Sequence, residues 1–355
     1  MSSTTKKSAS AVGKKNPDFF RTLPKVEAHS HLDGALRPEL VLRLAKEQGH
    51  PLAEKSLEEI AKIVVVSSAR DSLKEVLDAF FTIYPLLKVP AAMEEAAYEA
   101  CRQANNDHAL YFETRFAPSL MAGERFGMDE ILDGALKGLA RGRKDFGVSS
   151  GVIITMLRDH PLKENEAMFQ LACRYKDKGV VGLDLANHES ASSFDDYADF
   201  YREAKRQGLF TTVHAGEVYP SPDLPAVLRV GIDRIGHGVF LPKYPDLLQE
   251  VAWRKIPIEV NLTSNVRTAA VKSYQEHPLP KFLELGIPVI LNTDDYGIFG
   301  IDLTHEYQAA AKELQLSPAE LCRIARNGID TLFCSDERKT ECRRLFDQQS
   351  AGLCF

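Results

Sequence analysis

The sequence has no run of about 18 apolar residues, so nothing in it predicts a membrane-spanning helix. It also has no excess of basic residues, because 50 Asp and Glu outnumber 44 Lys and Arg and give a net charge of −6. A surface that binds nucleic acid needs a positive field. We therefore expect neither a membrane nor a nucleic acid as a partner.

The chain also lacks short-spaced cysteines. Its six cysteines are scattered, and no two of them form a C-x-x-C pair, which excludes a thioredoxin motif and a zinc ribbon. Scattered thiols of this kind are typical of a reducing compartment, so we expect a cytoplasmic protein. Residues 1–17 carry lysines but no apolar signal-peptide segment, and we expect them to form a disordered basic tail.

Short β-rich segments recur along the rest of the chain. They occupy residues 25–28, 109–113, 152–155, 180–184, 210–213, 234–235, 257–260 and 289–291. Stretches with helical periodicity separate most of them, and a long helical region at 71–106 precedes the second segment. Strands that alternate with helices predict a parallel sheet.

Eight such units fit a closed (β/α)8 TIM barrel better than an open doubly wound sheet. We therefore predict an α/β fold with a helical insertion after the first strand. Amphipathic residues 318–332 and the polar helix at 336–346 are expected to close the barrel. We expect residues 18–350 to form a single domain.

Histidines and carboxylates follow four of the predicted strands. They are His29 and His31 in the first, His214 and Glu217 after the fifth, His237 in the sixth, and Asp294 and Asp295 after the eighth. All strands of a barrel open with their carboxyl ends on one face, so these side chains should converge. Imidazole nitrogen and carboxylate oxygen bind zinc, and a catalytic zinc site keeps a position for water. The pattern predicts a metal-dependent catalytic site.

The residue types also suggest roles. Zinc lowers the pKa of a bound water to about 7, and His237 is suited to position that water and accept its proton. Glu217 lies three residues after His214 and could act as the acid without binding the metal. Neighbouring residues of a strand point to opposite sides, so Asp294 and Asp295 should differ in role, one binding metal and the other substrate.

Five motifs between about residues 20 and 335 resemble the adenosine deaminase family of metal-dependent barrel hydrolases. They are residues 23–34, His214-Ala215-Gly216-Glu217, residues 234–239, Thr263-Ser264-Asn265 and Asn292-Thr293-Asp294-Asp295. The resemblance implies hydrolytic deamination of adenosine or 2′-deoxyadenosine by a protein that is usually a monomer. It also implies one Zn²⁺ per chain, with His29, His31, His214 and Asp294 as ligands.

The resemblance further implies how the purine is held. Glu217 would protonate purine N1, and His237 would be the base and electrostatic partner of the nucleophile. Asp295 would accept a hydrogen bond from N7, and Asp33 would contact the ribose 5′-hydroxyl. Asn187 stands where the family offers a backbone N–H to purine N3. An apolar gate over the pocket would include Leu73, Val76, Leu77 and Phe80.

The substrate has two alternatives within the family. Asn187 replaces the family's usual Gly, and Tyr296 replaces a usual Pro. The segment 262–265 and the non-Pro residue at 296 are similar to the branch that deaminates N6-methyl-AMP. That branch usually has Asn in place of Asp33, and the adenine-preferring branch tends to have Glu there. Asp33 and the intact His-Ala-Gly-Glu motif therefore favour adenosine over both.

Two alternatives come from other classes of protein. A catalytically inactive barrel could serve as a binding protein, but such proteins usually lose a ligand or the acid, and every one is present here. Residues 147–151 spell G-x-S-x-G, yet a helix precedes them and a strand follows, the reverse of a nucleophile elbow. The remaining histidines are expected at surface or capping positions, with His188 a candidate near substrate, and Arg115 in a buried ion pair. Those surface or capping histidines are His50, His108, His160, His277 and His305.

Overall fold

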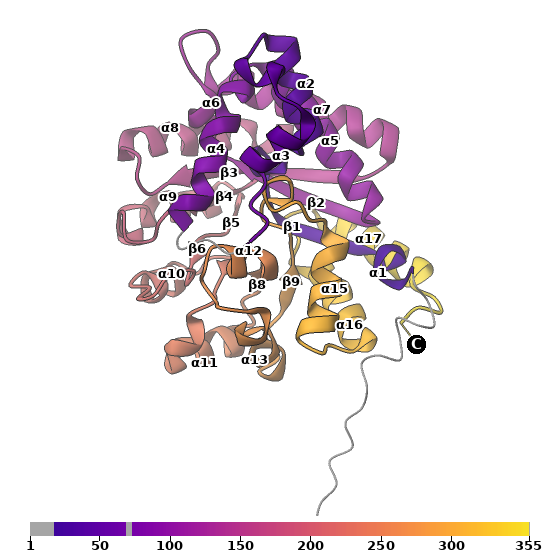
Figure 1. Cartoon of the computed structure of the whole chain (residues 1–355). Coiled ribbons are helices and arrows are strands. Elements are labelled where there is room, and N and C mark those ends of the chain that lie inside the picture. The colour runs from indigo at the N-terminus through magenta and orange to yellow at the C-terminus, as the bar shows by residue number, and fades with distance from the viewer. Residues whose placement is uncertain (1–17, 69–72, 355) are drawn as a thin grey trace, which may run out of the picture.

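The computed structural model describes residues 18–68 and 73–354 of the chain, and the tail expected at 1–17 lies outside them. Strands at the centre are surrounded by helices (Figure 1). The strands are β1 Lys25–His31, β2 Ala109–Phe116, β3 Ser149–Leu157, β4 Val180–Ala186, β5 Phe210–Thr211, β6 His214–Ala215, β7 Ile235–His237, β8 Ile258–Val260 and β9 Val289–Leu291.

All strand pairs are parallel, in one sheet of order β1-β2-β3-β4-β5 and another of order β6-β7-β8-β9. β5 and β6 are two parts of one strand that residues 212–213 interrupt, so the barrel has eight strand positions. The ring closes where Ser30 pairs with Asp294. There the His31 N–H donates to the Asp294 carbonyl at 2.8 Å, and the Asp294 N–H donates to the His29 carbonyl at 3.0 Å. The predicted α/β barrel is confirmed.

The helices cover the outside of the strands and one end of the barrel (Figure 1). They are α1 Phe19–Thr22, α2 Pro38–Gln48, α3 Leu57–Val64, α4 Leu73–Leu87, α5 Pro90–Asn106, α6 Pro118–Met121, α7 Met128–Phe146, α8 Leu162–Tyr175, α9 Ala198–Arg206, α10 Leu224–Val230, α11 Pro245–Arg254, α12 Leu262–Arg267, α13 Leu279–Glu284, α14 Tyr296–Phe299, α15 Leu303–Glu313, α16 Pro318–Gly328 and α17 Asp336–Gln349.

The predicted insertion after the first strand is present as α2 to α5. The helical region expected over 71–106 consists of two helices, α4 and α5, with a break at residues 88–89. Pro90 begins α5 there, and proline fits the first turn of a helix but not its interior. The sequence had given no indication of α14 and α15.

Burial explains why the strands are so apolar. Every residue of β3 except Ser150 is buried, as expected for a parallel strand that helices and the barrel interior cover on both sides. A connected hydrophobic core runs from Phe19 to Phe346. The single domain over residues 18–350 stays a prediction, which this continuous core supports. No helix in the described ranges is long and apolar enough to cross a membrane.

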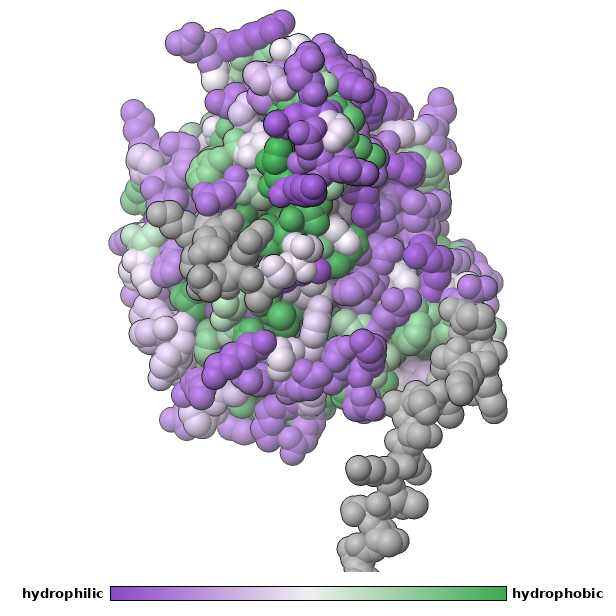
Figure 2. Space-filling view, viewed as in Figure 1, coloured by the Kyte–Doolittle hydropathy of each residue, from purple (hydrophilic) through white to green (hydrophobic). Residues whose placement is uncertain are grey.

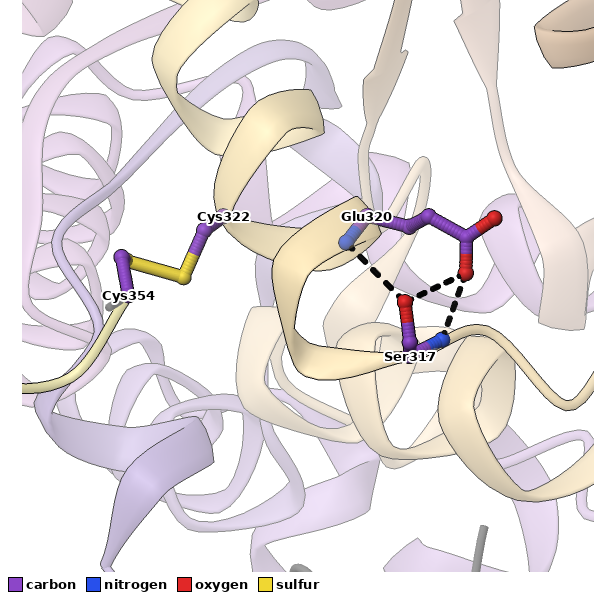
Figure 3. Close-up of a disulfide and its surroundings, with 4 residues drawn as sticks. All are labelled: Ser317, Glu320, Cys322 and Cys354. Carbon is purple, nitrogen blue, oxygen red and sulfur yellow. Dashed lines mark hydrogen bonds between the residues drawn. A yellow bond between two sulfur atoms is a disulfide. The ribbon is translucent and has the colours of Figure 1, made fainter. Parts of the chain in front are cut away.

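The α16 helix packs against β1 and β9 and so covers the seam of the barrel. A capping box starts it, in which the Ser317 N–H donates to Glu320 Oε2 at 2.7 Å and the Glu320 N–H donates to Ser317 Oγ at 3.3 Å (Figure 3). A disulfide joins Cys322 of this helix to Cys354. The expectation of thiols was therefore wrong for these two cysteines, because the fold brings the end of the chain beside α16.

Candidate active site

Four of the predicted residues form a compact cluster at the carboxyl ends of the strands. His29 and His31 come from β1, His214 from β6, and Asp294 from the segment after β9. One ligand atom of each lies within 4.8 Å of the others. The Nε2 atoms of His31 and His214 are 3.2 Å apart, and Asp294 Oδ1 lies 3.1 Å from His29 Nε2. These residues could hold a metal ion.

Backbone geometry explains how the cluster forms. His29 and His31 share one side of β1 because side chains alternate along a strand. The same rule does not apply to Asp294 and Asp295, since β9 ends at Leu291 and Asp294 has a φ of 60°. The prediction that the two carboxylates point to opposite sides was wrong, and both line the same pocket.

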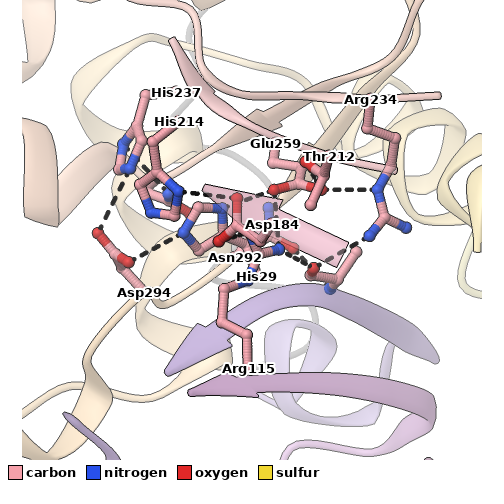
Figure 4. A network of polar contacts seen from close by, with 12 residues as sticks. His29, Arg115, Asp184, Thr212, His214, Arg234, His237, Glu259, Asn292 and Asp294 are labelled. Carbon is pink, nitrogen blue, oxygen red and sulfur yellow. Dashed lines mark hydrogen bonds and ion pairs between the residues drawn. The ribbon is translucent and has the colours of Figure 1, made fainter. Parts of the chain in front are cut away.

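Carboxylates orient two of the imidazoles from behind (Figure 4). The Nδ1 atom of His29 lies 2.6 Å from Glu259 Oε2, and Nδ1 of His214 lies 3.1 Å from Asp184 Oδ1. A carboxylate there holds a proton on Nδ1 and leaves the Nε2 lone pair for a metal. The Nε2 atom of His29 is buried and faces the rest of the cluster, with Asp294 Oδ1 3.1 Å away. The donor set therefore fits a zinc ion, which takes such ligands in tetrahedral geometry.

Two buried arginines hold these carboxylates in place. Arg115 donates to Glu259 at 2.9 Å and to Asp184 at 3.2 Å, and Arg234 donates to Glu259 at 2.6 Å (Figure 4). Burial alone would raise the pKa of Glu259, but the two guanidinium groups hold it well below its ordinary value. Arg115 forms a buried ion pair, as expected. Because its partners Glu259 and Asp184 orient the imidazoles, Arg115 helps to hold His29 and His214 in position.

Glu217 and His237 face the cluster. His237 Nε2 lies 3.7 Å from Glu217 Oε2 and 3.9 Å from Asp294 Oδ2. Burial raises the pKa of Glu217 to about 8, and the negative charges of Asp294 and Glu189 add to this effect. The Glu217 carboxyl therefore keeps its proton at neutral pH, as a general acid must.

Glu189 was missed by the sequence analysis. Its buried carboxylate accepts hydrogen bonds from three successive backbone N–H groups, those of Gly216, Glu217 and Val218, at 3.0, 2.7 and 3.1 Å. It therefore fixes the turn that carries Glu217. No local motif marks it, since it is one carboxylate in a polar segment after β4.

A pocket opens from the cluster, and its lining includes Asp33, Asn187 and Phe80, which the sequence analysis expects to contact substrate. The side chains of Leu73 and Leu77 lie outside the described residues. Val76, another residue expected in the gate, lines the pocket, and so does Tyr84 of the same helix. Figure 2 shows hydrophobic surface gathered near the centre of the face that carries α3 and α12, with hydrophilic residues around it.

Tyr84 reaches across the pocket and was not singled out from the sequence. Its ring packs on Phe80 at 5.8 Å between centroids, and its hydroxyl hydrogen-bonds to the Asp33 carboxyl. Burial raises the pKa of Asp33 to about 7 despite that hydrogen bond. The tyrosine and the carboxyl both belong to the pocket lining.

The two departures from the family pattern have different outcomes. Asn187 has a φ of 71°, and Gly and Asn are the residues that adopt this left-handed conformation most readily. Its side-chain amide donates to Asp159 at 2.6 Å. Tyr296 is buried beside the Arg37 guanidinium and is not among the residues of the pocket lining.

Several buried polar atoms of the pocket have no hydrogen-bond partner. They are Asp33 Oδ1, Thr155 Oγ1, Ser264 Oγ, Thr268 Oγ1 and Asp295 Oδ1. Buried polar groups are almost always satisfied in folded proteins, so a group of orphans in one pocket is typical of a site for a polar ligand. Among the described residues, the lining includes four carboxyl groups and neither lysine nor arginine.

Other sequence candidates lie away from the pocket. His188 is exposed and caps a turn by accepting the Ser190 N–H. The G-x-S-x-G segment follows α7, but only residues 147–148 form a connection and residues 149–151 belong to β3, so the expectation of a loop was wrong for these three residues. His277 was expected at the surface or in a cap. It does accept the Leu279 N–H, but it is only 3% exposed and contacts Asn265 beside His237.

Comparison with known proteins agrees with this arrangement. Residues 24–349 match the model of the adenosine deaminase family. The chain is 32% identical to the adenosine deaminase of Enterococcus faecalis over 328 residues, which are 92% of this chain and 97% of the relative. It is 31% identical to that of Clostridium kluyveri over 94% of this chain and 96% of the relative.

Solved structures share the fold. An N6-methyl-AMP deaminase from Arabidopsis thaliana has a TM-score of 0.83 at 27% identity, covering 95% of this chain and 100% of its own. The adenine deaminase of Arthrobacter aurescens has a TM-score of 0.82 at 26% identity, with 92% and 99% covered. An amidohydrolase from Burkhoderia ambifaria with bound Zn has a TM-score of 0.82 at 25% identity, with 94% and 93% covered. This chain belongs to the adenosine deaminase family of metal-dependent hydrolases.

Proposed function

We propose that the protein hydrolyses the 6-amino group of adenosine or 2′-deoxyadenosine and releases ammonia with inosine or 2′-deoxyinosine. The observation on which this proposal rests is the position of Glu217. This carboxyl, whose pKa burial raises to about 8, faces a cluster of three histidines and an aspartate that could hold a metal, in one pocket. Metal-assisted attack by water combined with a general acid is the chemistry of hydrolytic deamination.

The metal that we propose is one Zn²⁺ per chain, held by His29, His31, His214 and Asp294. The bound Zn in the Burkholderia relative supports the choice of ion. When bound, zinc would supply a water that is nucleophilic at neutral pH. His237 would orient this water through Nε2, which lies between Glu217 and Asp294.

The remaining contacts follow from the pocket. Glu217 would donate its proton to purine N1 and so make C6 electrophilic. Asp295 would bond to N7, and the backbone N–H of Asn187 to N3. Asp33 with Tyr84 would bind the ribose 5′-hydroxyl, because their polar groups lie together in the pocket lining. We propose Leu73, Val76, Leu77 and Phe80 as the apolar gate over the purine.

The charge of the pocket favours a nucleoside over a nucleotide. Four carboxyl groups line the described part of the pocket, without a lysine or arginine to pair with a 5′-phosphate. A phosphate carries about two negative charges, and a carboxylate beside it is repulsive. N6-methyl-AMP and adenine remain the alternative substrates, because an N6-methyl-AMP deaminase and an adenine deaminase share this fold. A catalytically inactive barrel is disfavoured because every expected ligand and acid is in place.

A substrate panel tests the proposal. Ammonia release by the purified, zinc-loaded protein would be measured with adenosine, 2′-deoxyadenosine, adenine and AMP, and methylamine release with N6-methyl-AMP. We expect the two nucleosides to have the highest kcat/KM. A higher value for N6-methyl-AMP or adenine would keep the metal chemistry and overturn the choice of substrate.

We also propose that the protein is a cytoplasmic monomer, which sedimentation and cell fractionation would test.

A further inference from the structure

A chain of three hydrogen-bonded side chains leads from a loop to the back of His237. Asn265 Nδ2 lies 3.0 Å from His237 Nδ1, and Asn265 Oδ1 lies 3.2 Å from His277 Nε2. All three residues are at least 97% buried. Asn265 belongs to α12, and His277 lies just before α13. The sequence analysis gave neither residue a role of its own.

Which group donates in each of these hydrogen bonds follows from the contacts of His277, the residue that does not touch His237. The backbone N–H of Leu279 donates to His277 Nδ1 at 3.1 Å, so this nitrogen is an acceptor and carries no proton. Burial lowers the pKa of His277 to about 3, so the ring is neutral and its single proton is on Nε2. His277 Nε2–H therefore donates to Asn265, and the oxygen of that amide must face His277.

The orientation of Asn265 then decides the state of His237. With its oxygen toward His277, the amide presents N–H to His237 Nδ1, which must accept it. Asn261 Nδ2 also lies 3.3 Å from the same nitrogen. Asn261 alone would not decide the direction, since its oxygen has no partner and the amide could be turned around. The proton of a neutral His237 is consequently on Nε2, the nitrogen that faces Glu217 and Asp294.

We propose, on the basis of the deaminase function above, that His277 is a positioning residue that acts through Asn265 to fix the tautomer of His237. His237 then offers an N–H to the reacting water. It would orient the water as a hydrogen-bond donor, and Glu217, once it has given its proton to purine N1, is the carboxylate that would accept the proton of the water. This replaces the role of base that the sequence suggested for His237.

A substitution that hardly alters the size of the side chain tests the direction of the hydrogen bonds from His277 through Asn265 to His237. It needs no measurement of activity. Asn265→Asp puts a carboxylate oxygen where the amide N–H was, so Nδ1 of His237 has to become a donor. Long-range ¹H–¹⁵N spectra of the full chain with ¹⁵N-labelled histidine report which nitrogen bears the proton, and a His237→Gln spectrum assigns the signal. We expect a protonated Nε2 and a bare Nδ1 in the wild type, and a protonated Nδ1 in N265D. A protonated Nδ1 in the wild type would overturn the proposal.

Kinetics separate positioning from simple packing. His277→Leu removes the donor, and we expect kcat for adenosine to fall by about 10–100-fold, the usual cost of losing such an outer partner, with KM nearly unchanged. His277→Gln keeps an N–H near the position of Nε2 and should recover most of that loss. His160→Gln is the matched control, because His160 pairs with Glu164 outside the pocket.

The outcomes can be told apart. If H277L and H277Q lose kcat equally, and the loss in each parallels its loss in melting temperature, His277 is only a packing residue. That result would overturn the proposal. If the wild type does not deaminate adenosine, the proposed function fails, and the histidine spectra still decide the tautomer.

Discussion

His29 Nδ1 lies 2.6 Å from Oε2 of Glu259 at the centre of the barrel, where both side chains are fully buried. Glu259 also accepts from Arg115, Arg234 and Thr212, so its carboxylate is held from several sides. The buried Glu259 carboxylate thus sets the tautomer and the ring orientation of His29, a proposed zinc ligand. The site depends on residues that never touch the substrate.

Glu259→Gln is expected to weaken zinc binding by about 10–100-fold, because an outer-shell carboxylate orients its histidine and raises its basicity. It also removes one of the two charged partners of Arg115 and of Arg234, which then keep only Asp184 and Glu113 in the core. Breaking a buried ion pair of this kind costs about 3–5 kcal/mol of unfolding free energy. Competition with a zinc chelator and denaturant titration measure the two effects. Glu341→Gln on the surface of α17 is the control, and an E259Q protein that matches it in both measurements would contradict the role of Glu259.

His214→Ala should lose both bound zinc and activity, because Nε2 of His214 converges with that of His31. His188→Ala is the matched control, since this exposed histidine lies outside the pocket lining. Metal content per chain and the rate of ammonia release would be measured on both variants. An H214A protein that still holds one zinc per chain would remove His214 from the ligand set.

Glu189→Gln is expected to shift the pH dependence of kcat/KM. Burial and Asp294 raise the pKa of Glu217, and the negative charge of Glu189 raises it further. Removing that charge lowers the pKa of Glu217, so the acid loses its proton at a lower pH. The alkaline limb of the profile should therefore move to lower pH in E189Q. If kcat/KM instead falls by the same factor at every pH and the alkaline limb does not move, Glu189 only holds the turn that carries Glu217.

The sequence predicts the barrel and the metal cluster because both follow from local patterns. Alternation along a strand places His29 and His31 on one side, and strand ends of a parallel barrel share one face. Glu189 and His277 were missed because their partners are distant in sequence, and nothing near either residue marks it. The relation of Asp294 to Asp295 was misjudged because the strand rule was extended past Leu291, where the chain turns into a left-handed conformation.

Cys354→Ser is expected to lower the unfolding free energy by about 2–4 kcal/mol under oxidising conditions, since the Cys322–Cys354 bond closes a loop across the end of the barrel. Neither cysteine lines the pocket, so kcat should not change. Denaturant titration with and without a reductant measures the effect, and the two proteins should become equal when reduced. An unaltered unfolding free energy under oxidising conditions would mean that the bond does not form in the purified protein.

The central claim is that Glu217 is the general acid of a zinc-dependent deaminase, and Glu217→Gln tests it most directly. Conversion of adenosine to inosine would be followed for the wild type and E217Q, each shown to hold one zinc per chain. We expect E217Q to keep the metal and the fold and to lose about 10²–10⁴-fold in kcat, the usual contribution of general acid catalysis. A zinc-loaded E217Q protein that forms inosine at the wild-type rate would contradict the claim.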